Sequence, residues 1–120
     1  MKPSTAKSKG TATESMFVDY LRRWAPFAER RRLAGQHDRG DIAGVPGIVF
    51  EVKSGARLAV AAWLDELDAE MLNDGAAHGA VVVRPKGKPD PADWFAIVRV
   101  PDLLDLLVEA EWLTKAGDKQ

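Results

Sequence analysis

The segment Ile48-Val49-Phe50-Glu51-Val52-Lys53 carries the strongest strand pattern in the chain. Side chains alternate between the two faces of a strand, so Ile48, Phe50 and Val52 share one face. Glu51 and Lys53 then lie together on the other face. A carboxylate and an amine so placed are often only a solvated ion pair, but they can also belong to a site. The segment predicts a strand with one apolar face and one face that can carry chemistry.

Regular patterns extend to both sides of this strand. Before it, apolar residues recur at helical spacing over about 12–25, and strand patterns cover 27–33 and 41–45. These two strands and 48–53 could form an antiparallel meander. After it we expect a helix over 58–73 that ends before Gly75, strands over 80–84 and 94–100, and a last helix opened by Pro101. The acids of the 58–73 helix, Asp65, Glu66, Asp68 and Glu70, are expected to point mostly outward. The predicted order is α-β-β-β-α-β-β-α, an α+β sandwich with helices against a mixed sheet.

Length and composition fit one small domain. Of the 120 residues, 46% are hydrophobic and 29% charged, enough for one modest core. We expect a flexible basic arm over 1–10, one domain over 11–113 and a flexible tail over 114–120. No apolar run reaches the roughly 18 residues of a membrane span, and the chain has no cysteine. A cytoplasmic protein without a membrane segment is therefore expected.

The net charge of −1 hides an asymmetry between the two halves of the chain. Residues 1–60 carry a net charge of +5 and residues 61–120 a net charge of −6. Charge separated in this way can give a nearly neutral protein one basic face. A polyanionic partner therefore stays possible.

An acid shortly before the central strand adds to its polar face. If the chain turns back at Pro46-Gly47, Asp41 and Glu51 approach each other at one sheet edge, with Lys53 beside them. Magnesium prefers oxygen ligands of this kind, and the Val52 carbonyl could add another. Lys53 could orient or deprotonate an attacking water, or neutralise charge that develops on phosphorus.

The stretch from Asp38 to Gly55, DRGDIAGVPGIVFEVKSG, resembles the PD-(D/E)XK nuclease superfamily. The resemblance covers about residues 9–108. Within this superfamily the chain is most similar to the small Holliday-junction-resolvase-like proteins, including those carried by phages of actinobacteria. It implies a restriction-endonuclease-like core, a mixed sheet flanked by helices, and Mg²⁺-dependent hydrolysis of DNA, with Mn²⁺ as a possible substitute. It also implies branched DNA as the substrate and a homodimer that makes two cuts. A phage-encoded protein would act in the cytoplasm of its bacterial host.

Carried over by position, the resemblance makes Asp41 and Glu51 the metal-binding acids and Lys53 the motif lysine. Glu14 matches an acid on the first helix of resolvase-like proteins, although Thr11 and Glu14 also have the spacing of a capping box. Gly40 stands where the motif usually has proline. Family members often carry a glutamine on the next helix, and that role is not transferred to Glu66 or Glu70.

Basic residues that could contact DNA lie mainly in the first half of the chain. Arg30, Arg31 and Arg32 occupy a predicted strand, where they could bind phosphate or protect a sheet edge. The other candidates are Arg39, Arg57 and Lys86. Two alternatives to a junction nuclease remain: a repair or recombination nuclease for other DNA structures, and a protein that binds DNA structures without cutting them.

Overall fold

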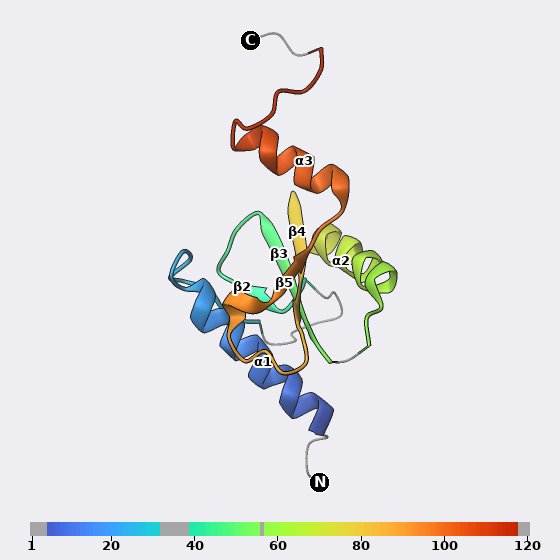
Figure 1. The fold of residues 1–120 in the computed structure, drawn as a ribbon. Coiled ribbons are helices and arrows are strands. Elements are labelled where there is room, and N and C mark those ends of the chain that lie inside the picture. Colours follow the sequence, from blue (N-terminus) through green and yellow to red (C-terminus); the bar gives the residue numbers. More distant parts are fainter. Residues whose placement is uncertain (1–4, 32–38, 56, 118–120) are drawn as a thin grey trace.

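The computed structural model describes residues 5–31, 39–55 and 57–117, with side chains from residue 10 onward (Figure 1). It has an α+β fold, and the order of helices and strands along the chain confirms the prediction. The elements are α1 (Thr5–Leu21), β1 (Glu29–Arg30), β2 (Ile42–Ala43), β3 (Ile48–Ser54), α2 (Val60–Asp74), β4 (His78–Arg84), a 3₁₀ turn η1 (Pro91–Asp93), β5 (Phe95–Ile97) and α3 (Val100–Glu109).

A three-stranded mixed sheet, in the order β3-β4-β5, forms the centre of the fold. β3 and β4 are parallel, with Ile48 opposite His78 and Ser54 opposite Arg84, whereas β5 is antiparallel to β4. Parallel neighbours need a crossover connection, which α2 provides. The interior residues of β4 are all buried, as expected for a strand covered on both faces.

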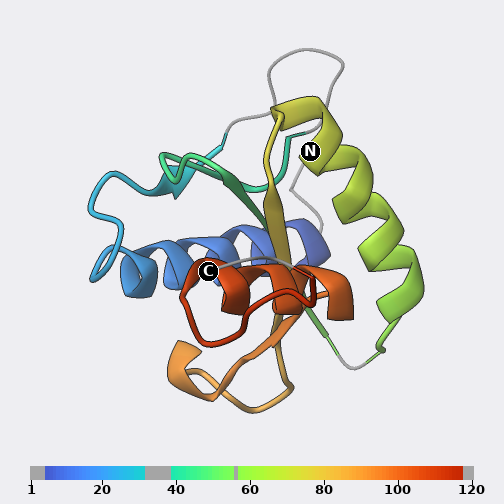
Figure 2. The ribbon, with the colours of Figure 1, turned by 90° about the horizontal axis from the view of Figure 1, so that it is seen from above.

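Two helices cover the two faces of this sheet. From α1, Phe17 and Val18 pack with Val52 and Val82. On the opposite face, Leu67 of α2 packs with an apolar group that comprises Val49, Val81 and Val83. Figures 1 and 2 show α1 and α2 on different sides of the strands. The predicted alternation of β3 is confirmed, and Glu51 and Lys53 share the face toward α2.

Helix α1 differs from the prediction at both ends. It begins at Thr5, inside the expected flexible arm, and ends at Leu21, with turns from Arg22 to Ala25. Thr11 therefore lies within the helix, and the predicted capping box does not exist. Thr13, one turn before Phe17, is 1% exposed, so tertiary packing stabilises the helix next to Thr11 as well as farther along.

The predicted three-stranded meander is only half correct. β1 and β2 pair in an antiparallel sheet of their own, with Arg30 opposite Ile42. The segment before β2 meets β3 through a backbone hydrogen bond, 3.1 Å long, from the Asp41 N–H to the Phe50 carbonyl. Gly44 has a φ of +85° and lies so close to the Phe27 carbonyl that no side chain would fit there. This close approach lies directly after the end of β2 at Ala43.

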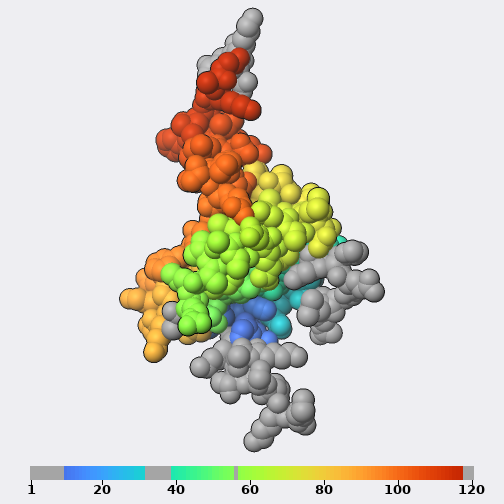
Figure 3. Space-filling model, turned by 90° about the vertical axis from the view of Figure 1, so that its right-hand side faces the viewer, coloured from blue at the N-terminus to red at the C-terminus, as the bar shows by residue number. Residues whose placement is uncertain are grey.

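The molecule is elongated, with extents of 60 × 33 × 30 Å. α3 and the segment after it project from one end of the sheet (Figures 1 and 3). Within the described part of the chain, no helix combines the length and the apolarity needed to cross a membrane.

Candidate active site

Asp41 is hydrogen-bonded to β3 along one edge of the strand. Its backbone N–H donates to the Phe50 carbonyl, and its carboxylate Oδ2 accepts a 2.7 Å hydrogen bond from the Val52 N–H. In a strand, the N–H and the carbonyl of one residue point toward the same edge, so the Val52 carbonyl also faces the Asp41 side. Asp41 and the Val52 carbonyl, two of the predicted metal ligands, therefore lie at one edge.

The backbone conformation at Gly40 is incompatible with the proline that the motif usually has at this position. Its φ is +94°, whereas a proline ring fixes φ near −65°. A Cβ at this position would lie 2.5 Å from Val49 Cγ1 and 3.3 Å from Glu70 Oε2. Only glycine fits this backbone, and its missing side chain lets the chain before Asp41 pass close to α2.

Glu51 and Lys53 extend from β3 toward α2. Glu51 is 5% exposed, and the Lys53 ammonium lies 3.6 Å from its Oε1. The same ammonium lies 3.2 Å from Glu66 Oε2 on α2. Lys53 thus bridges an acid of the strand and an acid of the helix.

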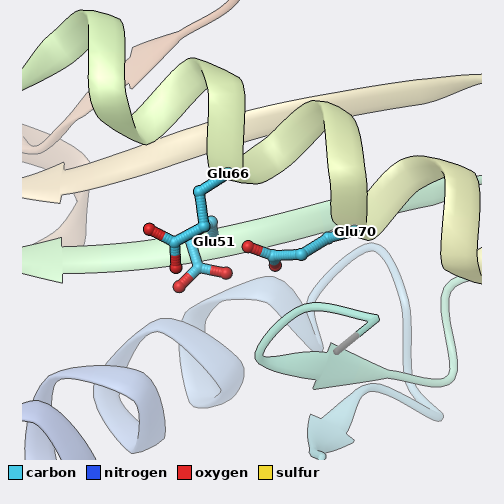
Figure 4. A group of neighbouring side chains, drawn as sticks. All are labelled: Glu51, Glu66 and Glu70. Atoms are coloured by element: carbon cyan, nitrogen blue, oxygen red, sulfur yellow. The ribbon is translucent and has the colours of Figure 1, made fainter. Parts of the chain in front are cut away.

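Two acids of α2 complete a carboxylate cluster that consists of Glu51, Glu66 and Glu70 (Figure 4). One carboxylate oxygen from each residue can be chosen so that all three lie within 4.8 Å of one another. The sequence predicted that the acids of this helix point mostly outward, which is wrong for Glu70, because that residue is 1% exposed. Glu66 and Glu70 are four residues apart and so share one helix face, which here packs on β3.

Burial and like charges strongly perturb the cluster. Burial raises the pKa of Glu51 to about 11, helped by a hydrogen bond with Glu70 and by the charges of Asp41 and Glu70, against the lowering effect of Lys53. Among the described residues, no group other than the neighbouring acid is placed to donate to the buried Glu51 Oε2. Burial and the neighbouring acids therefore favour the protonated form of Glu51, and the Lys53 ammonium offsets them only in part.

Lys53 is held in its charged form. Burial lowers its pKa, but the charges of Glu51, Glu66 and Asp41 and the hydrogen bond to Glu66 outweigh burial, so the net shift is upward. An ammonium group can donate hydrogen bonds but cannot accept a proton. Of the roles considered for Lys53, orientation of water and stabilisation of charge fit this environment, and deprotonation of water does not.

Glu14 lies near the site but outside the carboxylate cluster. Its pKa is raised by burial and by the charge of Asp41, and lowered by Arg30, whose Nε lies 3.9 Å from the Glu14 carboxylate. Because Thr11 is inside α1, the cap interpretation of Glu14 is wrong. The predicted metal set of Asp41, Glu51, the Val52 carbonyl and Glu14 shares only Glu51 with the three-glutamate cluster.

The predicted DNA-contacting residues occupy different environments. Arg31 holds the fold together: its guanidinium lies 3.5 Å from Asp74 and donates to the Ile42 carbonyl. Arg30 is 41% exposed beside Glu14. Arg39, Arg57 and Lys86 are exposed, and Arg32 lies outside the described residues.

No protein-family model, curated protein sequence or solved structure matches this chain. Its class therefore follows from its own geometry. It is an α+β protein in which a partly buried carboxylate cluster and a lysine lie between the edge strand of a mixed sheet and the helix that crosses over it.

Proposed function

We propose that this chain is a metal-dependent DNA endonuclease with a restriction-endonuclease-like core. One observation carries the proposal: within the described residues only two charged residues are buried, Glu51 and Glu70, and they adjoin each other. A buried pair of like charges destabilises a fold unless a counter-charge accompanies it. Asp41 and Lys53 beside this pair match the residue types that phosphodiester hydrolysis needs.

The donor set fits a hard divalent cation. All three groups of the cluster are carboxylates, which suit Mg²⁺ or Mn²⁺ and not a soft metal. Glu51, Glu66 and Glu70 would hold the cation, and its charge would offset the repulsion between carboxylates that raises the pKa of Glu51. When bound, the cation would supply Lewis-acid activation of water and neutralise charge on the phosphate.

The residues around the cluster have separable roles in this proposal. The Lys53 ammonium would donate to a phosphate oxygen or position the attacking water. Asp41, through its bond to the Val52 N–H, would fix the strand edge where Glu51 and Lys53 begin. Glu14 would add negative charge near Asp41 and hold Arg30 beside the site.

DNA is the substrate that the charge distribution favours. Residues 1–60 carry a net charge of +5, and the guanidinium of Arg30 is exposed beside the acids. Arg39, Arg57 and Lys86 would bind backbone phosphates, which supply most of the salt-dependent affinity for DNA. Arg31 is assigned to the fold and not to DNA. Branched DNA and a phage origin remain expectations from the family resemblance.

Cleavage of a four-way junction, a flap and a linear duplex, with Mg²⁺ and with chelator, tests this function. We expect cleavage only with the cation, and losses of about 100-fold or more in Glu51→Gln and Asp41→Asn with DNA binding retained. Asp19→Asn, which removes an exposed acid of α1, is the matched control and should cut normally.

A readout without DNA separates metal binding from activity. Titration calorimetry with Mn²⁺ alone should give a binding signal that Glu70→Gln weakens and Asp19→Asn leaves unchanged. Junction binding in chelator, with no nicking at any cation concentration, would instead identify a DNA-structure-binding protein. Normal cleavage by Glu51→Gln would remove the carboxylate cluster from the mechanism.

A further inference from the structure

The turn that follows α1 carries two aromatic side chains that face solvent. Trp24 is 66% exposed and Phe27 is 83% exposed, although aromatic side chains usually bury most of their surface. This turn projects from the body of the molecule at the end of α1 (Figures 1 and 2). Single exposed apolar residues are common on proteins, but two large rings three positions apart on a projecting turn indicate a binding surface.

Hydrogen bonds hold this turn in a defined conformation. The N–H groups of Trp24 and Ala25 both donate to the Leu21 carbonyl, at 2.9 Å each. Arg22 Nε donates a 2.8 Å hydrogen bond to the carbonyl of Ala28, which closes the turn from the helix side. The two rings therefore lie on a preformed backbone, and a ligand does not have to order the turn in order to bind.

Guanidinium groups lie among the rings. Arg23 Cζ is 4.9 Å from the centroid of the Tyr20 ring, and the Trp24 ring is 5.1 Å from the same Tyr20 ring. Tyr20 thus holds a cation and an aromatic ring next to each other. Arg30, which is 41% exposed, follows Phe27 in the chain. We define the aromatic–arginine surface as Tyr20, Arg22, Arg23, Trp24, Phe27 and Arg30.

Planar rings next to arginines are suited to unpaired nucleotides. Every base has a flat π face that can stack on a Trp or Phe ring, and the planar guanidinium group binds phosphate. In a paired duplex the base faces are stacked on one another and are not available to such rings. The chemistry of this surface therefore favours a single-stranded segment of nucleic acid over a duplex.

An anionic lipid surface also binds basic and aromatic residues, but two features disfavour it here. Asp19 and Glu29 flank the aromatic–arginine surface in the sequence and are exposed, so a flat anionic membrane would meet carboxylates as well as arginines. Membrane-surface helices also present a long apolar face to the lipid. Helix α1 instead turns Phe17 and Val18 into the protein core. A flexible strand of nucleic acid can follow the arginines and avoid the acids.

The aromatic–arginine surface leads toward the candidate active site. The Phe27 carbonyl lies against Gly44, which is three residues after Asp41 in the chain. Arg30 Nε lies 3.9 Å from the Glu14 carboxylate, and at most about 10 Å of chain separates Phe27 from Arg30. A strand that crosses the rings and passes Arg30 would therefore approach the edge of β3 that holds Asp41.

We propose that the aromatic–arginine surface binds an unpaired strand of DNA, with bases stacked on Trp24 and Phe27 and phosphates held by Arg23 and Arg30. The choice of DNA rests on the proposed function. The surface adds to that function a requirement for unpaired bases next to the site of cleavage. A flap or a gap presents such bases, whereas a fully paired four-way junction does not.

Fluorescence anisotropy with a labelled oligothymidylate of about 12 nucleotides, in chelator, measures this binding. Trp24→Ala should weaken binding about 10-fold or more, and Trp24→Phe, which keeps a ring, should retain most of the affinity. Trp112→Ala is the matched control, because Trp112 is 78% exposed in the segment after α3, and it should bind normally. Circular dichroism checks the fold of each variant, and Phe27→Ala provides a second, independent loss of a stacking ring.

An abasic oligomer of the same length separates stacking from charge. Trp24→Ala and the wild-type chain should bind it equally, because it has no base to stack. Arg23→Gln should weaken binding of both oligomers and lower the slope of log affinity against log salt by about 0.7, the value for one phosphate contact of a single strand.

Equal affinity of Trp24→Ala and the wild-type chain for oligothymidylate would overturn the proposal, as would an equal loss on the abasic oligomer. Binding to phosphatidylserine vesicles without binding to oligothymidylate would identify a lipid surface instead. Tighter binding of oligouridylate would overturn the choice of DNA. Because chelator removes cleavage from the measurement, and Glu51→Gln should bind oligothymidylate normally, failure of this surface and failure of the nuclease function give different results.

Discussion

The strongest quantitative expectation concerns the pH dependence of stability in the absence of a cation. The ordinary pKa of the Glu51 carboxyl is 4.5, and burial against Glu70 and Asp41 raises it to about 11 in the folded chain. The folded state therefore holds a proton that the unfolded chain releases above pH 4.5. This contribution to stability is complete below that pH and is lost as the pH rises toward the folded pKa.

The magnitude follows from the length of this window. Between about pH 5.5 and pH 7.5 the unfolded carboxyl is ionised and the folded one is protonated, so each pH unit lowers the unfolding free energy by about 1.36 kcal/mol. The two units together amount to about 3 kcal/mol. The result does not depend on the precise folded pKa, provided that it lies well above 7.5. Glu51→Gln, which cannot titrate, should lack this part of the slope.

Urea unfolding at several pH values in chelator measures the effect, with Asp19→Asn as the exposed control that should follow the wild-type curve. Addition of Mg²⁺ should flatten the wild-type curve, because a bound cation replaces the proton, and should affect Glu51→Gln less. Parallel wild-type and Glu51→Gln curves in chelator would refute the electrostatic account. A wild-type slope that Mg²⁺ leaves unchanged would refute cation binding alone.

Three further predictions concern the backbone and α3. Gly40→Ala should lower the unfolding free energy measured in urea by about 2–4 kcal/mol, because it adds a clash with Val49 to a positive φ. The control Gly47→Ala, at φ +88° in open space, should lower it by only about 1 kcal/mol. Equal losses would contradict the close packing around Gly40. The hydrogen bond to Asp102 raises the pKa of His78 despite burial, with Glu109 adding to the shift, so attachment of α3 should be strongest below pH 6.5 and weaken at higher pH. An NMR titration that finds the imidazole midpoint at or below 6.5 would contradict this contact. Glu111 has a φ of +67°, so Glu111→Gly should raise the unfolding free energy by about 0.5–1 kcal/mol in the same urea assay, and no gain would show that this backbone is unstrained.

The order of elements could be predicted because each one leaves a local mark. Period-two alternation marks β3, a continuous apolar run marks β4, and Gly75 ends α2 in the left-handed conformation expected of it. The strand pairing could not be predicted in the same way. It depends on Gly44 meeting the Phe27 carbonyl, a contact between residues 17 positions apart that has no local pattern.

The candidate site was predicted in part, for a related reason. Period-two spacing predicts that Glu51 and Lys53 share a face, and the structure confirms it. The sequence favours solvent exposure for Glu66 and Glu70, since acids spaced four apart usually mark the exposed side of a helix. One signal in the sequence was available. The helix that carries these acids comes directly after a strand that carries an acid and a lysine. Only the packing of α2 on β3 turns that spacing into a carboxylate cluster.

The position of the buried acids argues for a site and not for a structural feature. A chain of this size has a net stability of about 5–15 kcal/mol, so the loss of about 3 kcal/mol near neutral pH is a large share of it. Apolar side chains at positions 51 and 70 would continue the core formed by Val49, Leu67 and Val81 and would remove this penalty. A structural role would therefore be served better by leucine. Under the proposed function, a cation bound by the carboxylates would reverse the sign of this penalty, because charges that repel one another would become ligands.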